Sequence, residues 1–364
     1  MPRIGITELP LHGGEAPAWL FNRMVKLSAG ISEVIIKEYG AAELVKRMAD
    51  PFWFQALSCV LGFDWHSSGT TTVTCGAIKS ALRSHPDIGV AGGKGLISRQ
   101  VPEEISRFAV AHGLSPEKER RLKYCSRMSA KVDSSVLQDG HRLYHHFMIF
   151  DMQGNWSVIQ QGMNEASGFA RRYQWSSEKL ENFVVEPHSA VIGKRMGYVL
   201  DMTAKESETT RSCSVDLVKE DLRKLERQVI LVNKEQSTLL EWAGEKPIKL
   251  YMPKNLNWTA LKRAYDFQPR NYEELISLTG VGPSTVRALA LISQLIYGTG
   301  ASWKDPVKFS FAFGGKDGVP YPVDKLAMDL SLELIKSGIE ESHISSSEKL
   351  DAIKRLKNVI PPDN

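Results

Sequence analysis

The chain has few cysteines and no cysteine pair of the kind that binds metal or carries redox chemistry. Only four of its 364 residues are cysteine, and none belongs to a C-x-x-C pair. The absence of such pairs argues against a zinc knuckle and against a redox dithiol. We therefore expect reduced, mostly buried thiols.

Long apolar runs and a strong excess of charge are also missing. No apolar stretch approaches the 18 or so residues that a membrane span requires, and the first residues show no secretory signal pattern. We therefore expect a cytoplasmic protein without a membrane span. The formal net charge of +4 permits nucleic-acid binding but argues for it only if the basic side chains are clustered.

What the chain does contain is ordinary globular composition, with 42% apolar and 24% charged residues. This excludes disorder over most of the chain. The length predicts about two domains. Gly-rich turns separate short apolar segments before residues 175–190, and helical periodicity dominates afterwards. We predict an α+β protein, with a mixed α/β module (1–185), a helical connector (186–250) and a mainly helical C-terminal module (251–364).

Several elements follow from local patterns. Residues 19–49 show helical spacing of apolar side chains, and Asp50-Pro51 ends that pattern and begins another helix. Residues 142–163 predict a β-hairpin, because two apolar runs flank the turn-forming residues 151–155. Residues 213–238 predict one long, charged helix that bridges two domains.

The most specific local signal is the turn Gly280-Val281-Gly282 between two apolar helical stretches. It resembles the helix-hairpin-helix motif of DNA-repair and recombination proteins. In such a hairpin, glycines allow close backbone approach and the second helix directs its N–H groups at a phosphate. Binding would then be independent of sequence and sensitive to salt. The predicted phosphate-binding residues are Gly280, Gly282, Ser284, Thr285 and Arg287; the alternative is a plain helix–helix turn.

A second feature lies downstream, at Pro322-Val323-Asp324. It resembles the stretch of helix-hairpin-helix DNA glycosylases that carries their catalytic carboxylate, which would be Asp324. Ser284 occupies the position of the Schiff-base lysine of bifunctional members, and the separation from Gly282 is longer than in that fold. Alternatively, Asp324 caps the following helix. Lys316, within Gly314-Gly-Lys-Asp-Gly318, lies in a possible second phosphate-binding loop.

Polar side chains are dense in the N-terminal half. The loop Gly62–Thr72 combines Asp64, His66 and several hydroxyls, which suits a phosphate cradle, a metal ligand pair or an activated water. The same hydroxyls would otherwise cap neighbouring helices.

A second polar cluster surrounds the predicted β-hairpin: Asp133, Asp139, His141, His145, His146 and Asp151, with Gln160 and Gln161 on the partner strand. On the first strand, His145 and His146 are expected to point to opposite faces. Carboxylates and imidazoles near strand ends suit a phosphodiesterase dependent on Mg²⁺ or Mn²⁺, with Asp133, Asp139 and His145 as ligands. The acidic-x-Lys signature of the commonest nuclease fold is absent. The alternative is a structural hairpin with exposed histidines.

Basic side chains cluster at 118–123 and at Arg171-Arg172. Tyr173 and Trp175 interleave with the second cluster, a pattern that favours binding of single strands. Taken alone, each cluster is more often an ordinary solvated face. The loop Gly92-Gly-Lys94-Gly95 lacks the spacing of a Walker sequence, so we infer no ATP binding.

Taken together, several longer stretches resemble the domain-of-unknown-function family 763 of archaea and some bacteria. They are Gly5–Gly14, Pro51–Gln55, Gly62–Thr71, Gly92–Gly95, Gln160–Met163 and Gly314–Gly318. The resemblance covers essentially the whole chain and implies a prokaryotic cytosolic protein. It implies no activity, so the function rests on the residues.

The sequence therefore predicts a DNA-binding protein of DNA processing or repair. We favour a metal-dependent nuclease; the alternatives are a glycosylase using Asp324 and a non-enzymatic DNA-binding protein. The predicted partner is DNA, single- or double-stranded. A homodimer or a repair-complex partner is also compatible with the sequence.

Overall fold

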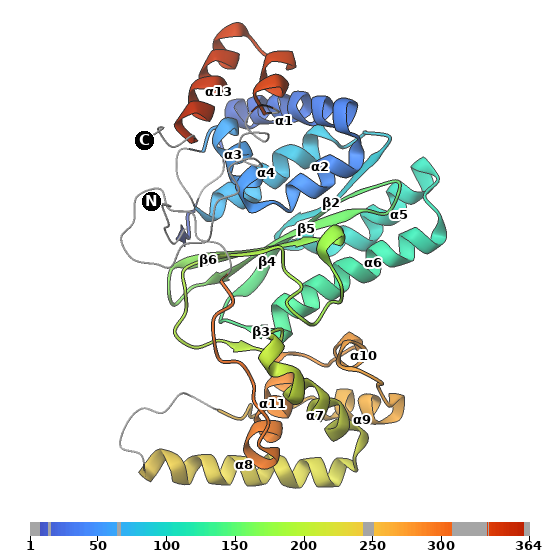
Figure 1. Ribbon diagram of the computed structural model, residues 1–364, viewed down its shortest axis with the longest axis vertical. Coiled ribbons are helices and arrows are strands. Elements are labelled where there is room, and N and C mark those ends of the chain that lie inside the picture. The colour runs from blue at the N-terminus through green and yellow to red at the C-terminus, as the bar shows by residue number, and fades with distance from the viewer. Residues whose placement is uncertain are drawn as a thin grey trace.

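The computed structural model describes residues 8–13, 16–63, 67–242, 251–307, 333 and 335–359, and of 234–242 and 356–359 only the backbone. An antiparallel sheet with helices on both faces forms the N-terminal half, and further helices follow it (Figure 1). The predicted α+β class is confirmed. Within the described residues, no helix is long and apolar enough to cross a membrane.

The central sheet has the strand order β1-β6-β5-β4-β2, with β7 added to β6. Its strands are β1 (Leu9–Pro10), β2 (Ile88–Lys94), β4 (Arg142–Asp151), β5 (Trp156–Asn164), β6 (Phe169–Ser176) and β7 (Ala190–Gly193). β4 and β5 form the predicted hairpin, with Phe150 opposite Trp156 and a register shift between Leu143 and His145. A short second sheet pairs β3 (Leu137–Gln138) with β8 (Leu200–Asp201).

Four helices cover one face of the sheet: α1 (Ala18–Tyr39), α2 (Ala41–Met48), α3 (Pro51–Leu61) and α4 (Ser68–Ala81). The single helix expected over 19–49 is two helices, because Gly40 adopts φ +89° between them. The predicted start at Pro51 is confirmed, and Asp50 caps α3 by accepting a hydrogen bond from Trp53 N at 2.8 Å. Ser67 and Thr70 cap α4 reciprocally.

The opposite face carries the 3₁₀ turn η1 (Gly95–Gln100), α5 (Val101–His112) and α6 (Pro116–Lys131), followed by the π-helical turn η2 (Val132–Val136). The apolar core on this face continues into the C-terminal helices, so both halves share one core.

The C-terminal helices are α7 (Glu208–Lys219), α8 (Leu222–Trp242), α9 (Trp258–Phe267), α10 (Tyr272–Ser277) and α11 (Pro283–Tyr297). The single helix expected over 213–238 breaks between α7 and α8. There Glu220 is extended, and the Asp221 carboxylate accepts a hydrogen bond from Arg223 N at the start of α8. The chain therefore ends one helix and begins the next at a side-chain hydrogen bond, and neither Gly nor Pro marks the position in the sequence.

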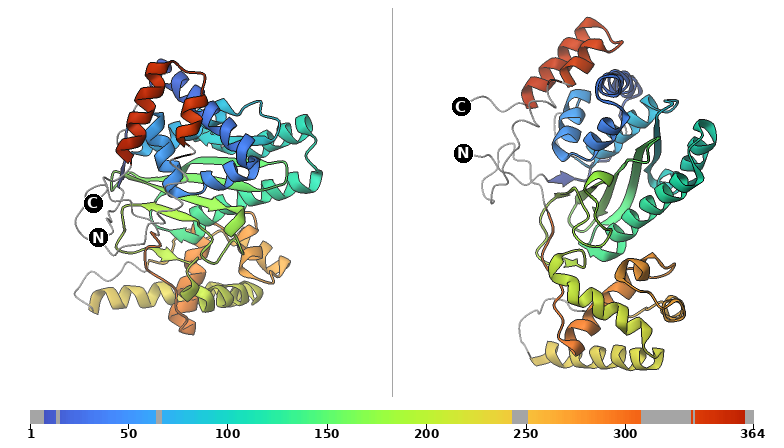
Figure 2. Two further views of the ribbon diagram at one scale, coloured as in Figure 1. Left: turned by 45° about the horizontal axis from the view of Figure 1, so that its top comes forward. Right: turned by 45° about the vertical axis from the view of Figure 1, so that its right-hand side comes forward.

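The last described helices return to the first layer, although the sequence placed them with the C-terminal module. The helical residues 335–341 and α13 (Ser346–Val359) lie beside α1 and α3 (Figure 2). A Cβ on Gly338 would lie 2.6 Å from Ile31 Cα, and Arg355 Nε donates a hydrogen bond to Val60 O. Segments from both ends of the described chain therefore complete one layer.

Candidate active-site groove

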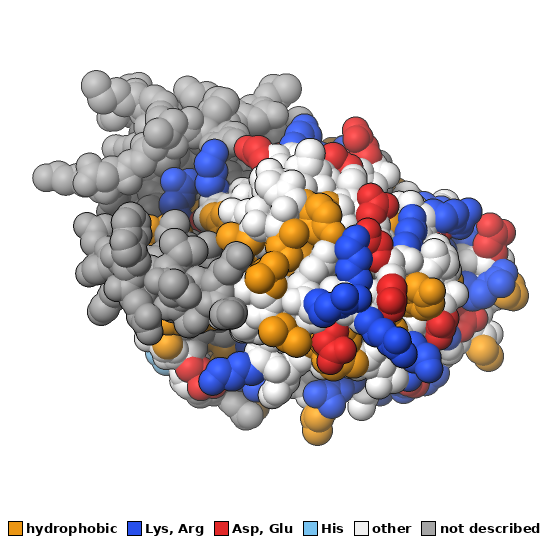
Figure 3. Space-filling view, turned by 90° about the horizontal axis from the view of Figure 1, so that it is seen from below, with side chains coloured by type: hydrophobic (Ala, Val, Ile, Leu, Met, Phe, Trp, Pro, Cys, Tyr) orange, Lys and Arg blue, Asp and Glu red, His pale blue; other side chains and the backbone are white. Residues whose placement is uncertain are grey.

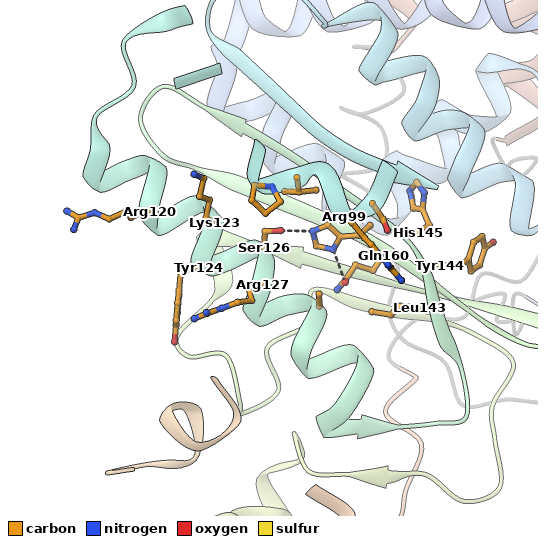
Figure 4. A pocket seen from close by; sticks show the side chains of 15 residues that line it. Arg99, Arg120, Lys123, Tyr124, Ser126, Arg127, Leu143, Tyr144, His145 and Gln160 are labelled. Atoms are coloured by element: carbon orange, nitrogen blue, oxygen red, sulfur yellow. Dashed lines mark hydrogen bonds between the residues drawn. The ribbon is translucent and has the colours of Figure 1, made fainter. Parts of the chain in front are cut away.

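A groove of about 590 Å³ lies between α6, η1 and the beginning of β4 (Figure 4). Its lining combines basic side chains with hydroxyl, imidazole and amide groups: Arg99, Arg120, Lys123, Arg127, Ser98, Tyr124, Ser126, Tyr144, His145, His146 and Gln160. The basic cluster seen in the sequence at 118–123 contributes to this wall.

Most cationic side chains that line the groove have no carboxylate nearby among the described residues. Arg99, Arg120 and Arg127 are exposed, and within the described part of the chain none has a carboxylate oxygen within 4 Å. Lys123 is different, because its Nζ lies 2.6 Å from Glu119 Oε1. The groove therefore favours anions.

A chain of hydrogen bonds runs from the floor of the groove into the core. Ser126 Oγ lies 2.8 Å from His146 Nε2, and His146 Nδ1 lies 2.9 Å from Gln160 Oε1; both bonds are drawn in Figure 4. Gln160 Nε2 then donates to Asp133 Oδ2 at 2.5 Å. The sheet register places His146 directly opposite Gln160. Ser126 lies on α6 and contacts this pair through His146.

Asp133 is the buried inner end of this relay. The π-helical turn η2 places it in the core, where Trp175 Nε1 donates to Oδ2 at 2.9 Å and His188 Nε2 lies 2.5 Å from Oδ1. Burial raises the pKa of the Asp133 carboxyl, and the neighbouring His188 opposes that rise.

The relay fixes the tautomer of His146. An ionised Asp133 can only accept hydrogen bonds, so the Trp175 indole N–H and the Gln160 NH₂ both donate to Oδ2 in that state. Gln160 Oε1 therefore faces His146 Nδ1, which must carry the hydrogen. Burial lowers the pKa of His146, so the imidazole is neutral and its Nε2 lone pair faces the Ser126 hydroxyl. This is the arrangement of a general base and a nucleophile.

Asp139 and His141 belong to a separate buried network. Asp139 Oδ2 accepts hydrogen bonds from Arg171 Nη1 at 2.9 Å and Tyr173 Oη at 2.6 Å, and Oδ1 accepts from His141 N. Burial alone would raise the pKa of Asp139, but His141 and Arg171 together lower it to about 2. Arg171 Nη2 also contacts Asp305 Oδ2 at 2.6 Å. The network joins β6 to the segment around residue 305.

The predicted metal ligands do not meet. Asp133 and Asp139 lie in the two networks just described, and His145 lies on the opposite face of the sheet beside Gln161. Among the residues that the structure describes, no group of three or more His, Cys, Asp or Glu side chains is placed to hold a metal ion. The three histidines of the hairpin region are buried, so the alternative of exposed histidines is corrected. A requirement for Mg²⁺ or Mn²⁺ stays a prediction.

Arg171 and Arg172 are both fully buried in β6. Neither lies on the exposed surface that their alternation with aromatic residues suggested. Successive strand residues point to opposite faces, so the two guanidinium groups enter different cores.

The segment that resembles a helix-hairpin-helix in the sequence consists of α10, a turn over residues 278–282 and α11. Its role in binding phosphate stays a prediction. Gly280 has φ +92°, and a Cβ there would lie 2.9 Å from Asn257 Nδ2. Gly280 is exposed, whereas Gly282 and Ser284 are half-buried and Thr285 is buried. Arg287 packs over the Trp303 ring and donates to Gln138 Oε1, so it faces the rest of the molecule.

Helix α6 connects the groove to this hairpin. Tyr124, on the wall of the groove, donates its hydroxyl hydrogen to Glu273 Oε1 of α10 at 2.6 Å. Further along α6, Lys131 Nζ lies 3.4 Å from Leu278 O at the turn. On the underside of the C-terminal helices, cationic, anionic and apolar side chains are mixed (Figure 3).

Four predicted site residues, Asp64, His66, Lys316 and Asp324, lie outside the described residues. Sequence reasoning missed Ser126 and His188, and it noted Trp175 only as an aromatic residue near Arg171-Arg172. No local pattern joins the three, because the relay brings together side chains up to 55 residues apart from α6, β6 and the segment before β7.

The fold and the groove define an α+β protein with a serine–histidine pair at the floor of a cation-lined groove. The chain belongs to the family described as a protein of unknown function, DUF763, whose model matches residues 5–323. The resemblance found in the sequence is thereby confirmed. Comparison with curated proteins gave no match, and comparison with solved structures gave none either.

Proposed function

We propose that this chain is a DNA-processing enzyme that cleaves phosphodiester bonds in the groove. The observation that carries the proposal is the Ser126–His146 pair, whose tautomer the relay to Asp133 fixes. Around it lie Arg99, Arg120 and Arg127, which have no partner carboxylate among the described residues. Such a pair activates a hydroxyl, and the cations would neutralise the phosphate oxygens.

The proposed reaction has two steps. Ser126 Oγ attacks phosphorus while its proton passes to His146 Nε2. The Oγ–P bond forms, the bond to the leaving sugar oxygen breaks, and that oxygen takes the proton from His146. Water then attacks the phosphoserine and gives a proton to His146, which returns it to the departing Oγ.

The turn between α10 and α11 supports DNA as the substrate. The turn residues Gly280 and Gly282 and the first turn of α11 resemble a helix-hairpin-helix, which holds phosphates without reading bases. The contacts of α6 with Glu273 and Leu278 join this turn to the helix that carries Ser126.

The experiment is an incubation of the purified chain with end-labelled single-stranded, duplex, flapped and damaged-base DNA. Each substrate is incubated with EDTA, Mg²⁺ or Mn²⁺. Ser126→Ala and His146→Gln are expected to slow cleavage by about a hundredfold or more while DNA binding persists. Ser98→Ala removes another hydroxyl of the same groove and is the matched control.

Each alternative gives a different result. Full cleavage by a folded Ser126→Ala variant would move the chemistry out of the groove. Scission by wild type that requires added metal would support the metal-dependent reaction predicted from the sequence. Strand breaks that appear only after alkali treatment, at a damaged base, would favour the glycosylase. Gel shifts without any cleavage product would favour a non-enzymatic DNA-binding protein.

Ser284→Glu tests the hairpin separately. A carboxylate in the first turn of α11 interacts favourably with the helix dipole, so folding is expected to be preserved while a phosphate is repelled. We expect weaker DNA binding, and Ser284→Gln, of the same size without charge, is the control. Unchanged binding by Ser284→Glu would mean that α11 does not face the DNA.

A further inference from the structure

A row of polar side chains lies on the face of the sheet opposite the groove. The strand register places His145 opposite Gln161, and Gln161 opposite Arg172. Adjacent strands are about 4.8 Å apart, so the row spans roughly 10 Å. Lys94, at the end of β2, is paired with His145 and extends the row to the surface.

The first two turns of α4 cover this row. Gln161 Nε2 donates to Ser68 O at 2.8 Å and also contacts the Tyr144 hydroxyl. Cys75, two turns further along α4, is close enough to Arg172 for the two groups to affect each other's pKa. Arg172 therefore lies beneath the middle of the 14-residue helix α4.

Arg172 has no hydrogen-bonding partner there. Its side chain is fully buried, and Nε, Nη1 and Nη2 all lack a partner in the described part of the chain, leaving only the Phe54 ring 4.5 Å away. Burial lowers the pKa of the guanidinium to about 10. The adjacent Arg171 is equally buried but contacts two carboxylates. A buried cation without a partner is costly, and a bound anion would remove that cost.

Other buried polar atoms of β4, β5 and α4 also lack partners. Both ring nitrogens of His145, Thr71 Oγ1 and Gln161 Oε1 make no hydrogen bond among the described residues. A neutral imidazole and a hydroxyl each supply a donor, whereas Gln161 Oε1 is an acceptor. A hydrogen phosphate matches this set, because it offers several acceptor oxygens and one P–O–H donor.

Stretches that the sequence analysis singled out separately also meet here. The hydroxyl-rich loop contributes Ser68 and Thr71, the Gly92–Gly95 loop contributes Lys94, and His12 N donates to Ser68 Oγ at 3.0 Å. The groove uses none of these residues.

We propose that Arg172, His145, Thr71 and Gln161 bind a single phosphate group between α4 and the sheet. The guanidinium provides a bidentate fork for two phosphate oxygens. Arg172, Thr71 and Gln161 do not line the groove, and only His145, on β4, borders both sites. The proposal therefore goes beyond the proposed function and does not depend on it.

The test measures binding of inorganic phosphate to the full chain by calorimetry and by thermal unfolding, at constant ionic strength against chloride. We expect saturable binding and a melting temperature that rises with phosphate concentration. Arg172→Gln is expected to weaken binding about tenfold or more. Arg99→Gln with Arg120→Gln and Arg127→Gln is the control, because it removes only groove cations.

Two outcomes would overturn the proposal. One is the absence of saturable binding by wild type at millimolar phosphate. The other is loss of binding in the groove variant but not in Arg172→Gln, which would place phosphate at the groove. If Arg172→Gln does not fold, Thr71→Val takes its place in the test. Unchanged phosphate affinity in Thr71→Val would also count against the site. A second titration, with a 5′-phosphorylated dinucleotide, distinguishes a nucleic-acid end from free phosphate as the ligand.

Discussion

His145 and His146 are neighbours in β4, yet they face opposite sides of the sheet and have different surroundings. His146 is fixed on both ring nitrogens by Ser126 and Gln160, whereas neither ring nitrogen of His145 has a partner among the described residues. The sequence alone predicted that the two would point apart. It did not reveal that His146, rather than His145, meets a hydroxyl, because Ser126 comes from a different element.

His145 makes stability dependent on pH. Burial lowers its pKa from 6.5 to about 3, so below pH 6.5 the unfolded chain binds a proton that the folded chain does not. The free energy of unfolding therefore falls as the pH drops from 6.5 toward 3. For this one group the loss between pH 6.5 and 5 is about 1.5 kcal/mol.

We expect His145→Gln to remove that part of the pH dependence. Urea unfolding at pH 6.5 and pH 5 measures it, and exposed His343→Gln is the control that should behave like wild type. An unchanged slope in His145→Gln would contradict the assignment of a buried, neutral imidazole.

At the scale of elements, local sequence patterns predicted where helices and strands begin better than they predicted where a helix is interrupted. The hairpin of β4 and β5 and the start of α3 follow from turn residues and from Pro51, and both are confirmed. The breaks between α1 and α2 and between α7 and α8 were missed. Gly40 and Asp221 each sit in an otherwise helical apolar pattern, and tertiary packing decides that the chain turns there.

The cap of α3 provides a test of one helix end. Asp50 is exposed and accepts the Trp53 N–H, so Asp50→Ala is expected to lower the free energy of unfolding by about 1 kcal/mol. Asp50→Ser keeps a capping oxygen and should stay close to wild type. Equal stability of the Ala and wild-type proteins in urea would show that this cap is not needed.

Gly92 provides a test of how closely β2 approaches β4. Its φ is +87°, and an added Cβ would lie 2.1 Å from His146 O. Gly92→Ala is expected to cost more than about 3 kcal/mol in chemical unfolding, because the neighbour is backbone and cannot rotate away. Gly197→Ala, with no atom within 4 Å of the new Cβ, is the matched control. A stable Gly92→Ala protein would contradict this close approach.

At the scale of the whole molecule, the proposed binding of DNA through the groove and the α10–α11 turn would be steeply dependent on salt. Each neutralised phosphate of duplex DNA contributes about 0.9 to the slope of log affinity against log salt. Replacing Arg99, Arg120 and Arg127 by Gln is therefore expected to reduce that slope by about 2 to 3. Fluorescence anisotropy over a range of salt concentrations measures it, and an unchanged slope would mean that DNA does not enter the groove.

The family, the fold class and the polar character of the hairpin region could all be predicted from the sequence. The two networks around Asp133 and Asp139 could not, because they depend on the register of three strands and on the π-helical turn that carries Asp133. Spacing along the chain suggested that both carboxylates and His145 converge. Side-chain alternation in β4 sends His145 away from them.

The return of residues 335–359 to α1 and α3 bears on the order in which the molecule is completed during translation. The apolar face of the first layer is made early, but Ile335, Ile339 and Ala352, which help to cover it, leave the ribosome more than 270 residues after α3 ends. Until then, the nascent chain exposes a hydrophobic surface of the kind that chaperones bind. Synthesis that stops before this point would leave that surface uncovered and favour aggregation.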